Sequence, residues 1–434
     1  MNMFDKVIGY DSIKNELLQI CDIISHPEVY EKLGAKIPKG VLLYGAPGLG
    51  KTLMAHCFME ETGLKSYTVR KTKGGNDFLT EIADTFNQAK ENAPSIILFD
   101  DLDKFSGTDD DKPTVEFTAI QAGIDEVKDD KVFVMATVNT IDNLPDSLLR
   151  SGRFDCQLRF WYPDALDAQK IISYYLQDKK VANDINIEDL VNMMQNCSCA
   201  SMESILNEAA ITAAYKREDE ITMPDIIRAV LKQQYSLPDS FTKLTSDKLR
   251  SNAIHEAGHL VVAEVLQPSS VGLASVRVTD TDSVQGFIHL CKQMAKRSEM
   301  ILVSLAGKAA VELYNSETCA GGCQSDLNNA MNSIRAAITE SGTLGMGMLS
   351  LRNRFYRETS DKFNEQTELV VHAELERYMF IVKDILNKHR SFLDNTVKAL
   401  MEKEVLTYSD IKQLRDSNQV TLKGETYEQT ELSA

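Results

Sequence analysis

GVLLYGAPGLGKT, at residues 40–52, is the stretch that decides the fold. An apolar run ends at Gly45, four residues separate it from Gly50, and a lysine and a threonine then open the amphipathic segment KTLMAHCFMEE. This order satisfies the pattern GxxxxGK[ST]. The alternative is a chance glycine-rich turn, but the position between an expected strand and an expected helix favours a phosphate-binding loop. The pattern predicts a phosphate-binding loop made of Gly45, Ala46, Pro47, Gly48, Leu49, Gly50, Lys51 and Thr52.

The chemistry of this loop predicts ATP and Mg²⁺ as ligands. Small residues let backbone N–H groups approach phosphate oxygens, and the N-terminus of the following helix adds partial positive charge. In such loops the lysine, here Lys51, reaches the β- and γ-phosphates, and the hydroxyl of Thr52 binds the metal.

Short apolar strands and amphipathic helices alternate on both sides of the loop. GVLLYG, SYTV, SIILFD and KVFVMAT read as buried strands, and LTEIADTFNQAKENA between them has helical periodicity. Strands that alternate with helices form a parallel sheet covered on both faces. We therefore expect an α/β nucleotide-binding domain over residues 1–160.

Acidic residues end one of these strands, in SIILFDDLD. Asp100 is placed to hold the hydration shell of Mg²⁺, and Asp101 follows it where a group that activates or orients the attacking water is expected. Asn139 ends the neighbouring strand, where it reaches the same water or the γ-phosphate. The alternative for Asn139 is a turn residue at the end of a strand.

Two arginines, Arg150 and Arg153, flank a glycine turn in LLRSGRFD. They are either solvated surface charges or groups that cross a subunit boundary and stabilise charge at a neighbour's γ-phosphate. The second interpretation requires a closed head-to-tail ring.

The pattern becomes helical after the sheet. We expect a helical lid at 161–238 with helix N-caps at Asp164 and Thr222, a linker at 239–247, and a mainly helical domain at 248–416 that contains a pair of strands. The polar residues 417–434 are expected to form a flexible tail.

The helix expected at 248–266 carries IHEAGHLVVAEVL. His255 and His259 lie four residues apart and so share one face, which allows both to bind one Zn²⁺, while Glu256 projects beside the metal as a general base. The alternative is a pair of histidines satisfied within a core. A catalytic zinc needs a third ligand, and spacing alone leaves Asp326, Asp280, Asp282 and Glu312 as candidates.

Composition excludes several classes of protein. The chain has 434 residues and a net charge of −17, which argues against binding to nucleic acid or to an anionic membrane surface. We find no apolar run of the length that a spanning helix needs and no signal peptide, so we expect a cytoplasmic protein without direct membrane insertion. The eight cysteines do not form a disulfide framework, and their close pairs lack the spacing of a second zinc site.

Taken together, these motifs resemble those of the FtsH-type AAA metalloproteases over residues 5–352. KLGAKIPKGVLLYGAPGLGKT, NQAKENAPSIILFDDLD, LPDSLLRSGRFD, SILNEAAITAA and HEAGH are similar to successive segments of that family. The resemblance of GCQSDLNNA selects Asp326 as the third zinc ligand. It also implies an AAA+ α/β domain, a helical lid and a mainly α-helical zinc metalloprotease domain, assembled as a homo-hexamer that threads protein substrates into a peptidase chamber.

The chain departs from the family pattern in three places. It begins at the ATPase domain without the family's transmembrane helices, which suggests either a soluble relative or a protein whose membrane anchoring is delegated to a partner. Asp101 stands where the family has a catalytic glutamate, and its shorter side chain predicts slow hydrolysis. Lys73, Gly74 and Gly75 occupy the place of the aromatic pore loop, so weak threading is expected unless Phe78 substitutes.

These features lead to one principal hypothesis, an ATP-dependent zinc endopeptidase that unfolds and degrades proteins. Asp101 and the altered pore loop favour a rival from another class, a nucleotide-dependent chaperone or remodelling scaffold with slow hydrolysis and a vestigial peptidase. A second rival is a peptidase that cleaves unfolded chains with little need of ATP.

Overall fold

The computed structural model describes residues 2–35, 38–71, 75–105, 115–237, 244–277, 286–315, 323–344 and 361–418. Most of the predicted linker, most of the predicted tail, and Lys73 and Gly74 of the pore-loop region lie outside these residues. The chain divides into two compact units, one formed by Met1–Ala182 and Asn196–Ile221 and the other by Asn183–Gln195 and Thr222–Ala434.

A parallel sheet forms the centre of the first unit, as the sequence predicts. Its strands are β1 (Gly40–Tyr44), β2 (Lys65–Val69), β3 (Ser95–Phe99), β4 (Val132–Val138) and β5 (Cys156–Arg159), in the order β2-β3-β4-β1-β5. The central strands are buried along their length because helices cover both faces, which explains their continuous apolar sequences. The carboxyl ends of β1, β3 and β4 lie together at one edge, where the phosphate loop also begins.

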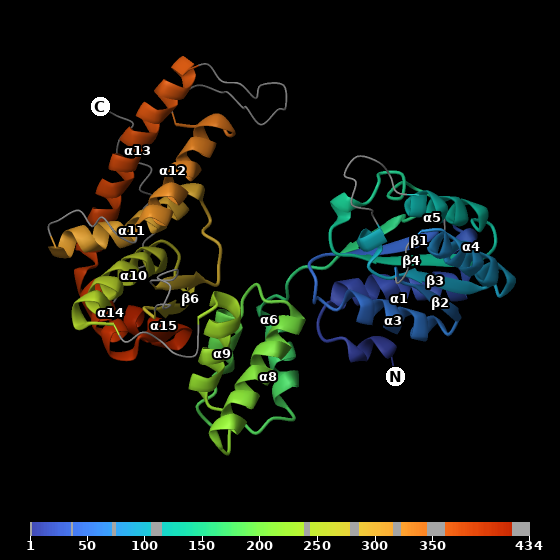
Figure 1. Cartoon of the computed structure of the whole chain (residues 1–434), viewed down its shortest axis with the longest axis horizontal. Coiled ribbons are helices and arrows are strands. Elements are labelled where there is room, and N and C mark those ends of the chain that lie inside the picture. The colour runs from blue at the N-terminus through green and yellow to red at the C-terminus, as the bar shows by residue number, and fades with distance from the viewer. Residues whose placement is uncertain are drawn as a thin grey trace. The chain divides into compact units, whose positions relative to one another are not determined.

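Two helical layers enclose this sheet (Figure 1). The short helices η1 (Met3–Lys6) and α2 (Pro27–Glu31) flank α1 (Asp11–Ser25), which lies with α3 (Lys51–Thr62) on one face. On the other face, α4 (Asn76–Glu91) and α5 (Val115–Glu126) pack beside η2 (Leu102–Phe105). The suggestion that Phe78 substitutes for a pore aromatic is wrong, because its ring is fully buried and packs on Phe105 with centroids 5.0 Å apart.

The predicted lid contains four helices, α6 (Ala165–Leu176), α7 (Ile187–Met193), α8 (Cys199–Lys216) and α9 (Met223–Tyr235). Both expected N-caps are confirmed: Asp164 accepts a hydrogen bond from the N–H of Asp167, and Thr222 forms a reciprocal capping box with Asp225. The two units divide these helices, with α6 and α8 in the first and α7 and α9 in the second. The predicted domain boundaries therefore stay a prediction.

The second unit is mainly helical, as expected, around the long helix α10 (Ser246–Leu266). Its other helices are α11 (Arg297–Asn315), α12 (Gln324–Thr339), α13 (Asp361–Lys388), α14 (Arg390–Lys403) and α15 (Tyr408–Ser417). The expected strand pair forms as β6 (Val271–Ser275) and β7 (Phe287–Leu290), and β8 (Val405–Thr407), which the sequence pattern did not reveal, completes the antiparallel sheet β7-β6-β8. Because α10 contacts α11, α14 and β6, most of its surface is apolar and buried.

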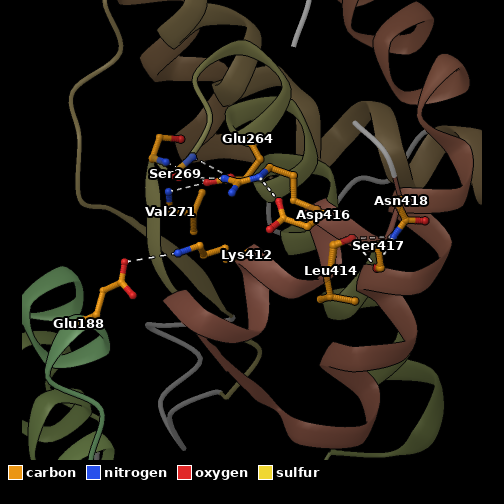
Figure 2. Close-up of polar contacts among 11 residues, drawn as sticks. Glu188, Glu264, Ser269, Val271, Lys412, Leu414, Asp416, Ser417 and Asn418 are labelled. Atoms are coloured by element: carbon orange, nitrogen blue, oxygen red, sulfur yellow. Dashed lines mark hydrogen bonds and ion pairs between the residues drawn. The ribbon is translucent and has the colours of Figure 1, made fainter. Parts of the chain in front are cut away.

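A buried ion pair joins the end of α10 to α15 (Figure 2). The carboxylate of Glu264 accepts hydrogen bonds of 2.9 Å from the backbone N–H groups of Ser269, Ser270 and Val271, and one of 2.8 Å from the guanidinium of Arg415. This contact fixes the turn into β6 because every acceptor of the buried carboxylate has a donor. Among the described residues, none of the helices has the length and apolar character that crossing a membrane requires.

Candidate nucleotide and metal sites

The loop between β1 and α3 has a backbone that only glycine adopts readily. Gly45 and Gly48 have φ angles of 147° and 77°. A Cβ atom on Gly45 would lie 2.3 Å from the carbonyl oxygen of Phe160, and one on Gly48 would lie 2.8 Å from the Ser198 hydroxyl. The loop therefore packs too closely against the end of β5 and the start of α8 to accept a side chain at either position.

Lys51 is turned back into this loop. Its ammonium group donates to the carbonyl oxygens of Gly45 and Ala46, at 2.7 and 2.9 Å, and to the side-chain oxygen of Asn139 at 2.9 Å. Burial lowers the pKa of Lys51, although nearby carboxylates, Asp101 foremost, oppose this shift. These neutral acceptors are replaceable, so the ammonium group is free to turn towards phosphate oxygens.

A cleft of about 680 Å³ opens beside the loop. One wall is the phosphate loop from Pro47 to Thr52, with Asp101 and Asn139. The opposite wall is largely apolar and comes from the N-terminal segment, α6 and the start of α8, including Ile8, Tyr10 and Ile171. Polar groups on one wall and apolar groups on the other suit a nucleotide, whose phosphates and base differ in the same way.

The acidic pair lies at the end of β3, next to the loop. Asp100 is buried, and its Oδ1 atom accepts from the hydroxyls of Thr52 and Thr137 at 2.8 and 2.7 Å. Burial favours its neutral form, but hydrogen bonds from Thr137, Thr52 and Arg70 outweigh burial and lower the pKa of Asp100. Asp101 has a φ angle of 56° and an ion pair of 2.6 Å with Lys104.

In the second unit, α10 and α12 bring three side chains together. The Nε2 atoms of His255 and His259 lie 3.1 Å apart, and Asp326 Oδ2 lies 3.1 Å from the first and 3.3 Å from the second. Ligand atoms around a tetrahedral zinc, at bonds of about 2.0–2.1 Å, lie roughly 3.3 Å from one another. This donor set therefore fits Zn²⁺ and leaves a fourth position open.

Other residues hold the two imidazoles in place. The Nδ1–H of His259 donates to the carbonyl oxygen of Val303 at 2.6 Å, and Nδ1 of His255 lies 3.9 Å from the Cys323 thiol. These contacts direct both Nε2 atoms towards Asp326, the usual role of groups that surround a metal's ligands. Hydrogen bonds with the histidines hold the pKa of Asp326 well below its ordinary value although burial opposes this, so it stays an anionic ligand.

Glu256 lies beside this cluster in a dry environment. Burial raises the pKa of its carboxyl group to about 8. Gly286, at the start of β7, approaches so closely that a Cβ atom there would lie 2.7 Å from Glu256 Oε1. A buried carboxyl with a raised pKa, next to a metal-binding set, suits proton transfer near neutral pH.

Both halves of the chain match known families. Residues 41–162 match the ATPase family associated with various cellular activities (AAA), and residues 243–414 match peptidase family M41. The chain is 30% identical to the ATP-dependent zinc metalloprotease FtsH 3 of Symbiobacterium thermophilum, over 95% of this chain and 70% of that protein.

The chain belongs to the FtsH family.

Two further relatives agree with this assignment. The chain is 30% identical to an ATP-dependent zinc metalloprotease FtsH of Leptotrichia buccalis, over 95% of this chain and 56% of that protein. It is 28% identical to an FtsH of Helicobacter pylori, over 95% of this chain and 70% of that protein. The family confirms the expected fold class and the expected ligands ATP, Mg²⁺ and Zn²⁺.

The two arginines of this FtsH-family chain have different surroundings. Arg153 is held within its own subunit: it forms an ion pair of 2.8 Å with Asp125 and donates to the carbonyl oxygen of Ser147. Arg150 is exposed. Neither lines the cleft formed by the described residues of its own chain, so their action on a γ-phosphate stays a prediction.

Spacing alone left the third ligand open, the family resemblance selected Asp326, and neither revealed several neighbours of the two sites. Among the alternatives to Asp326, Glu312 instead pairs with Lys308 and Lys383, and Asp280 and Asp282 lie outside the described residues. The missed residues are Arg70, Lys104, Gly286, Gly307 and Cys323. No sequence pattern marks these residues. Each is distinguished only by a contact that the fold creates, either with a distant segment of the chain or with a carboxylate of one of the two sites.

Proposed function

We propose that this chain is an ATP-dependent zinc endopeptidase that acts on proteins, with His255, His259 and Asp326 as zinc ligands. The observation that carries the proposal is the convergence of these three donors to within 3.3 Å of one another beside buried Glu256. A nucleotide cleft on the same polypeptide supports the dependence on ATP. Residues 1–160, 161–238 and 248–416 would form the ATPase, lid and peptidase domains.

In the peptidase, Glu256 does the proton transfer. Its carboxylate takes a proton from the attacking water and returns it to the leaving amine. Zinc, when bound, supplies Lewis acidity to the scissile carbonyl and to the water. Val303 holds His259, and Cys323 lies against His255, so that both rings keep the tautomer in which Nε2 is a ligand.

In the ATPase, Lys51 leaves the carbonyl oxygens of its own loop and contacts the β- and γ-phosphates. Thr52 and Asp100, whose side-chain oxygens lie 2.8 Å apart, would hold Mg²⁺, which would supply charge to neutralise the phosphates. Asp101 and Asn139 orient the attacking water. Because aspartate is one methylene shorter than glutamate, hydrolysis is slow.

The arginines act across subunits of a homo-hexameric ring. A head-to-tail ring gives every cleft an arginine from its neighbour, which stabilises charge in the transition state. Exposed Arg150 is the one that reaches the neighbour's γ-phosphate. Arg153 fixes the turn that presents it, through its contacts with Asp125 and Ser147.

We also propose that the protein works in the cytoplasm and does not bind nucleic acid. The seven cysteines in the described part of the chain form no disulfide with one another, which suits a reducing compartment. The net charge of −17 opposes contact with a polyanion.

The alternative function is a chaperone or remodelling scaffold with slow hydrolysis. The ion pair between Asp101 and Lys104 favours it, because a carboxylate held by an ammonium group is a poor base for water.

Casein degradation by the purified chain separates the possibilities. Loss of casein that ATP stimulates and a zinc chelator prevents is the expected result. Loss that needs zinc but not ATP would replace the proposal with an ATP-independent peptidase. No loss, with ATP still bound and slowly hydrolysed, would leave the scaffold.

A further inference from the structure

The guanidinium of Arg70 is bonded to Asp100, the carboxylate proposed to hold Mg²⁺. Arg70 directly follows β2, and its guanidinium donates to Asp100 Oδ2 from Nε at 2.8 Å and from a terminal nitrogen at 2.6 Å. The side chain of Asp100 is 4% exposed and that of Arg70 is 56% exposed. One partner is therefore fixed within the fold, and the other has room to move.

Asp100 has no acceptor site left over. A carboxylate has about four lone-pair positions. The hydroxyls of Thr52 and Thr137 take those of Oδ1, and the two N–H groups of Arg70 take those of Oδ2. A hydrated Mg²⁺ approaches Asp100 through water O–H donors or directly, so it must displace a donor. The two threonines are part of the packed site, which leaves Arg70 as the group that moves.

The displaced guanidinium has a place to go. Arg70 also lines a surface hollow of about 370 Å³ together with His56, Thr68 and Glu81. Glu81, on α4, offers this hollow a carboxylate. A guanidinium that leaves Asp100 can therefore exchange one anionic partner for another at little cost.

We propose that Arg70 is a positioning residue that neutralises Asp100 in the nucleotide-free chain and yields it to Mg²⁺ by turning into the hollow beside Glu81. The inference rests on the proposed nucleotide site and adds a competitor for its metal. In the absence of Mg²⁺, Arg70 shields the phosphates from the charge of Asp100 and so favours metal-free nucleotide. In the presence of Mg²⁺ it opposes binding of the metal–nucleotide complex.

The test is the Mg²⁺ dependence of nucleotide affinity. The dissociation constant of a fluorescent ADP analogue is measured on the full chain, once in EDTA and once in MgCl₂. The constant in EDTA divided by the constant in MgCl₂ gives a ratio, which is compared between the wild-type chain and its variants. Arg70→Ala removes both effects, so the ratio rises, on the order of tenfold for loss of a hydrogen-bonded ion pair. Arg70→Lys, with one point charge and no fork, gives a smaller rise. Glu81→Gln lowers the ratio in the presence of Arg70 and leaves it unchanged in the Arg70→Ala background.

Lys71→Ala is the matched control. It removes one positive charge from the next residue of the chain, and the ion pair that it breaks is with Glu116 and not with Asp100. An unchanged ratio in Arg70→Ala, or an equal rise in Lys71→Ala, would overturn the proposal. Equal weakening in both buffers would also overturn it, since that result means that Arg70 contacts phosphate. If the wild-type chain binds no nucleotide, the proposed function itself fails, and the two failures are thus distinct.

Discussion

Gly307 on α11 gives the zinc-site geometry its most direct test. A Cβ atom added there would lie 2.5 Å from His259 Nε2 and from His255 Cε1, and 2.6 Å from His255 Nε2. Ordinary contacts between such atoms are about 3.5–4.0 Å, so Gly307→Ala must displace the two rings by about 1 Å.

The surrounding structure leaves the imidazoles as the atoms that yield. Helices α10 and α11 pack in close contact, since a Cβ atom at Gly258 would lie 2.4 Å from the carbonyl oxygen of Ala306, and separating them would expose the apolar residues that both helices bury. The hydrogen bond from Nδ1 of His259 to the carbonyl oxygen of Val303, also on α11, limits how far this ring can turn away. Zinc–nitrogen bonds tolerate a change in length of only a few tenths of an ångström. We therefore expect the affinity for zinc to fall by at least about a hundredfold, which is a loss of about 2.7 kcal/mol in the free energy of zinc binding.

The fold itself survives this change. Alanine gains up to about 1 kcal/mol of helix propensity over glycine, and overpacking costs about 1–3 kcal/mol. The free energy of unfolding of the metal-free protein therefore falls by between about zero and 3 kcal/mol.

Zinc content by mass spectrometry and competition with a chromophoric chelator measure the effect, and circular dichroism checks the fold. Gly123→Ala is the control, because its Cβ atom would strike the Phe86 ring, at 2.3 Å, in the other compact unit. That variant carries similar overpacking and keeps wild-type zinc affinity. Stoichiometric zinc with wild-type affinity in Gly307→Ala would refute the proposed arrangement of the imidazoles.

Three further substitutions test other parts of the chain. Glu256→Gln lowers peptide cleavage by about 10²–10⁴-fold while zinc stays bound, and full cleavage would contradict its role as base. Burial raises the pKa of Glu256 from 4.5 to about 8, so the unfolded chain loses this proton at a lower pH than the folded chain does. The free energy of unfolding of the metal-free protein therefore falls as the pH rises between those two values. Denaturant titrations of Glu256→Gln, which has no such proton, lack this part of the pH dependence. Asp101→Glu raises the rate of ATP hydrolysis roughly tenfold or more in a phosphate-release assay, because the longer side chain reaches the water, and an unchanged rate would exclude its length as the limit. Glu264→Gln leaves Arg415 without its buried anion and lowers the free energy of unfolding by about 3 kcal/mol. The control Glu188→Gln removes one partner of a surface ion pair with Lys412 and changes this free energy by less than about 1 kcal/mol. Equal losses of the two variants in chemical denaturation would contradict this difference.

Each carboxylate of the acidic pair at the end of β3 has a basic neighbour. Asp101 is paired with Lys104, and Asp100 is paired with Arg70, so both carboxylates of the acidic pair have a cationic partner in the nucleotide-free chain. Each cation lowers the availability of a group that hydrolysis uses. We therefore propose that slow hydrolysis has two physical sources, the short side chain of Asp101 and competition for both carboxylates.

Residue order alone predicts the α/β class, the phosphate loop and the placing of His255 and His259 on one helix face. These features are local: a glycine-rich turn between a strand and a helix, and a spacing of four residues on one helix, have the same geometry in any fold. It also determined the N-caps at Asp164 and Thr222, because capping involves residues only three apart.

Spacing left Asp326 equal to its rivals as third zinc ligand, and only the family resemblance favoured it; the packing of the second unit is what brings its carboxylate to within 3.3 Å of both imidazoles. Only the tertiary structure placed Gly307 against the imidazoles, buried Phe78 away from solvent, and brought Arg70 onto Asp100. Each of these contacts joins residues that are tens of positions apart or that point from different elements. Their distances depend on how helices and strands pack, and a pattern of residue types along the chain does not encode that packing directly.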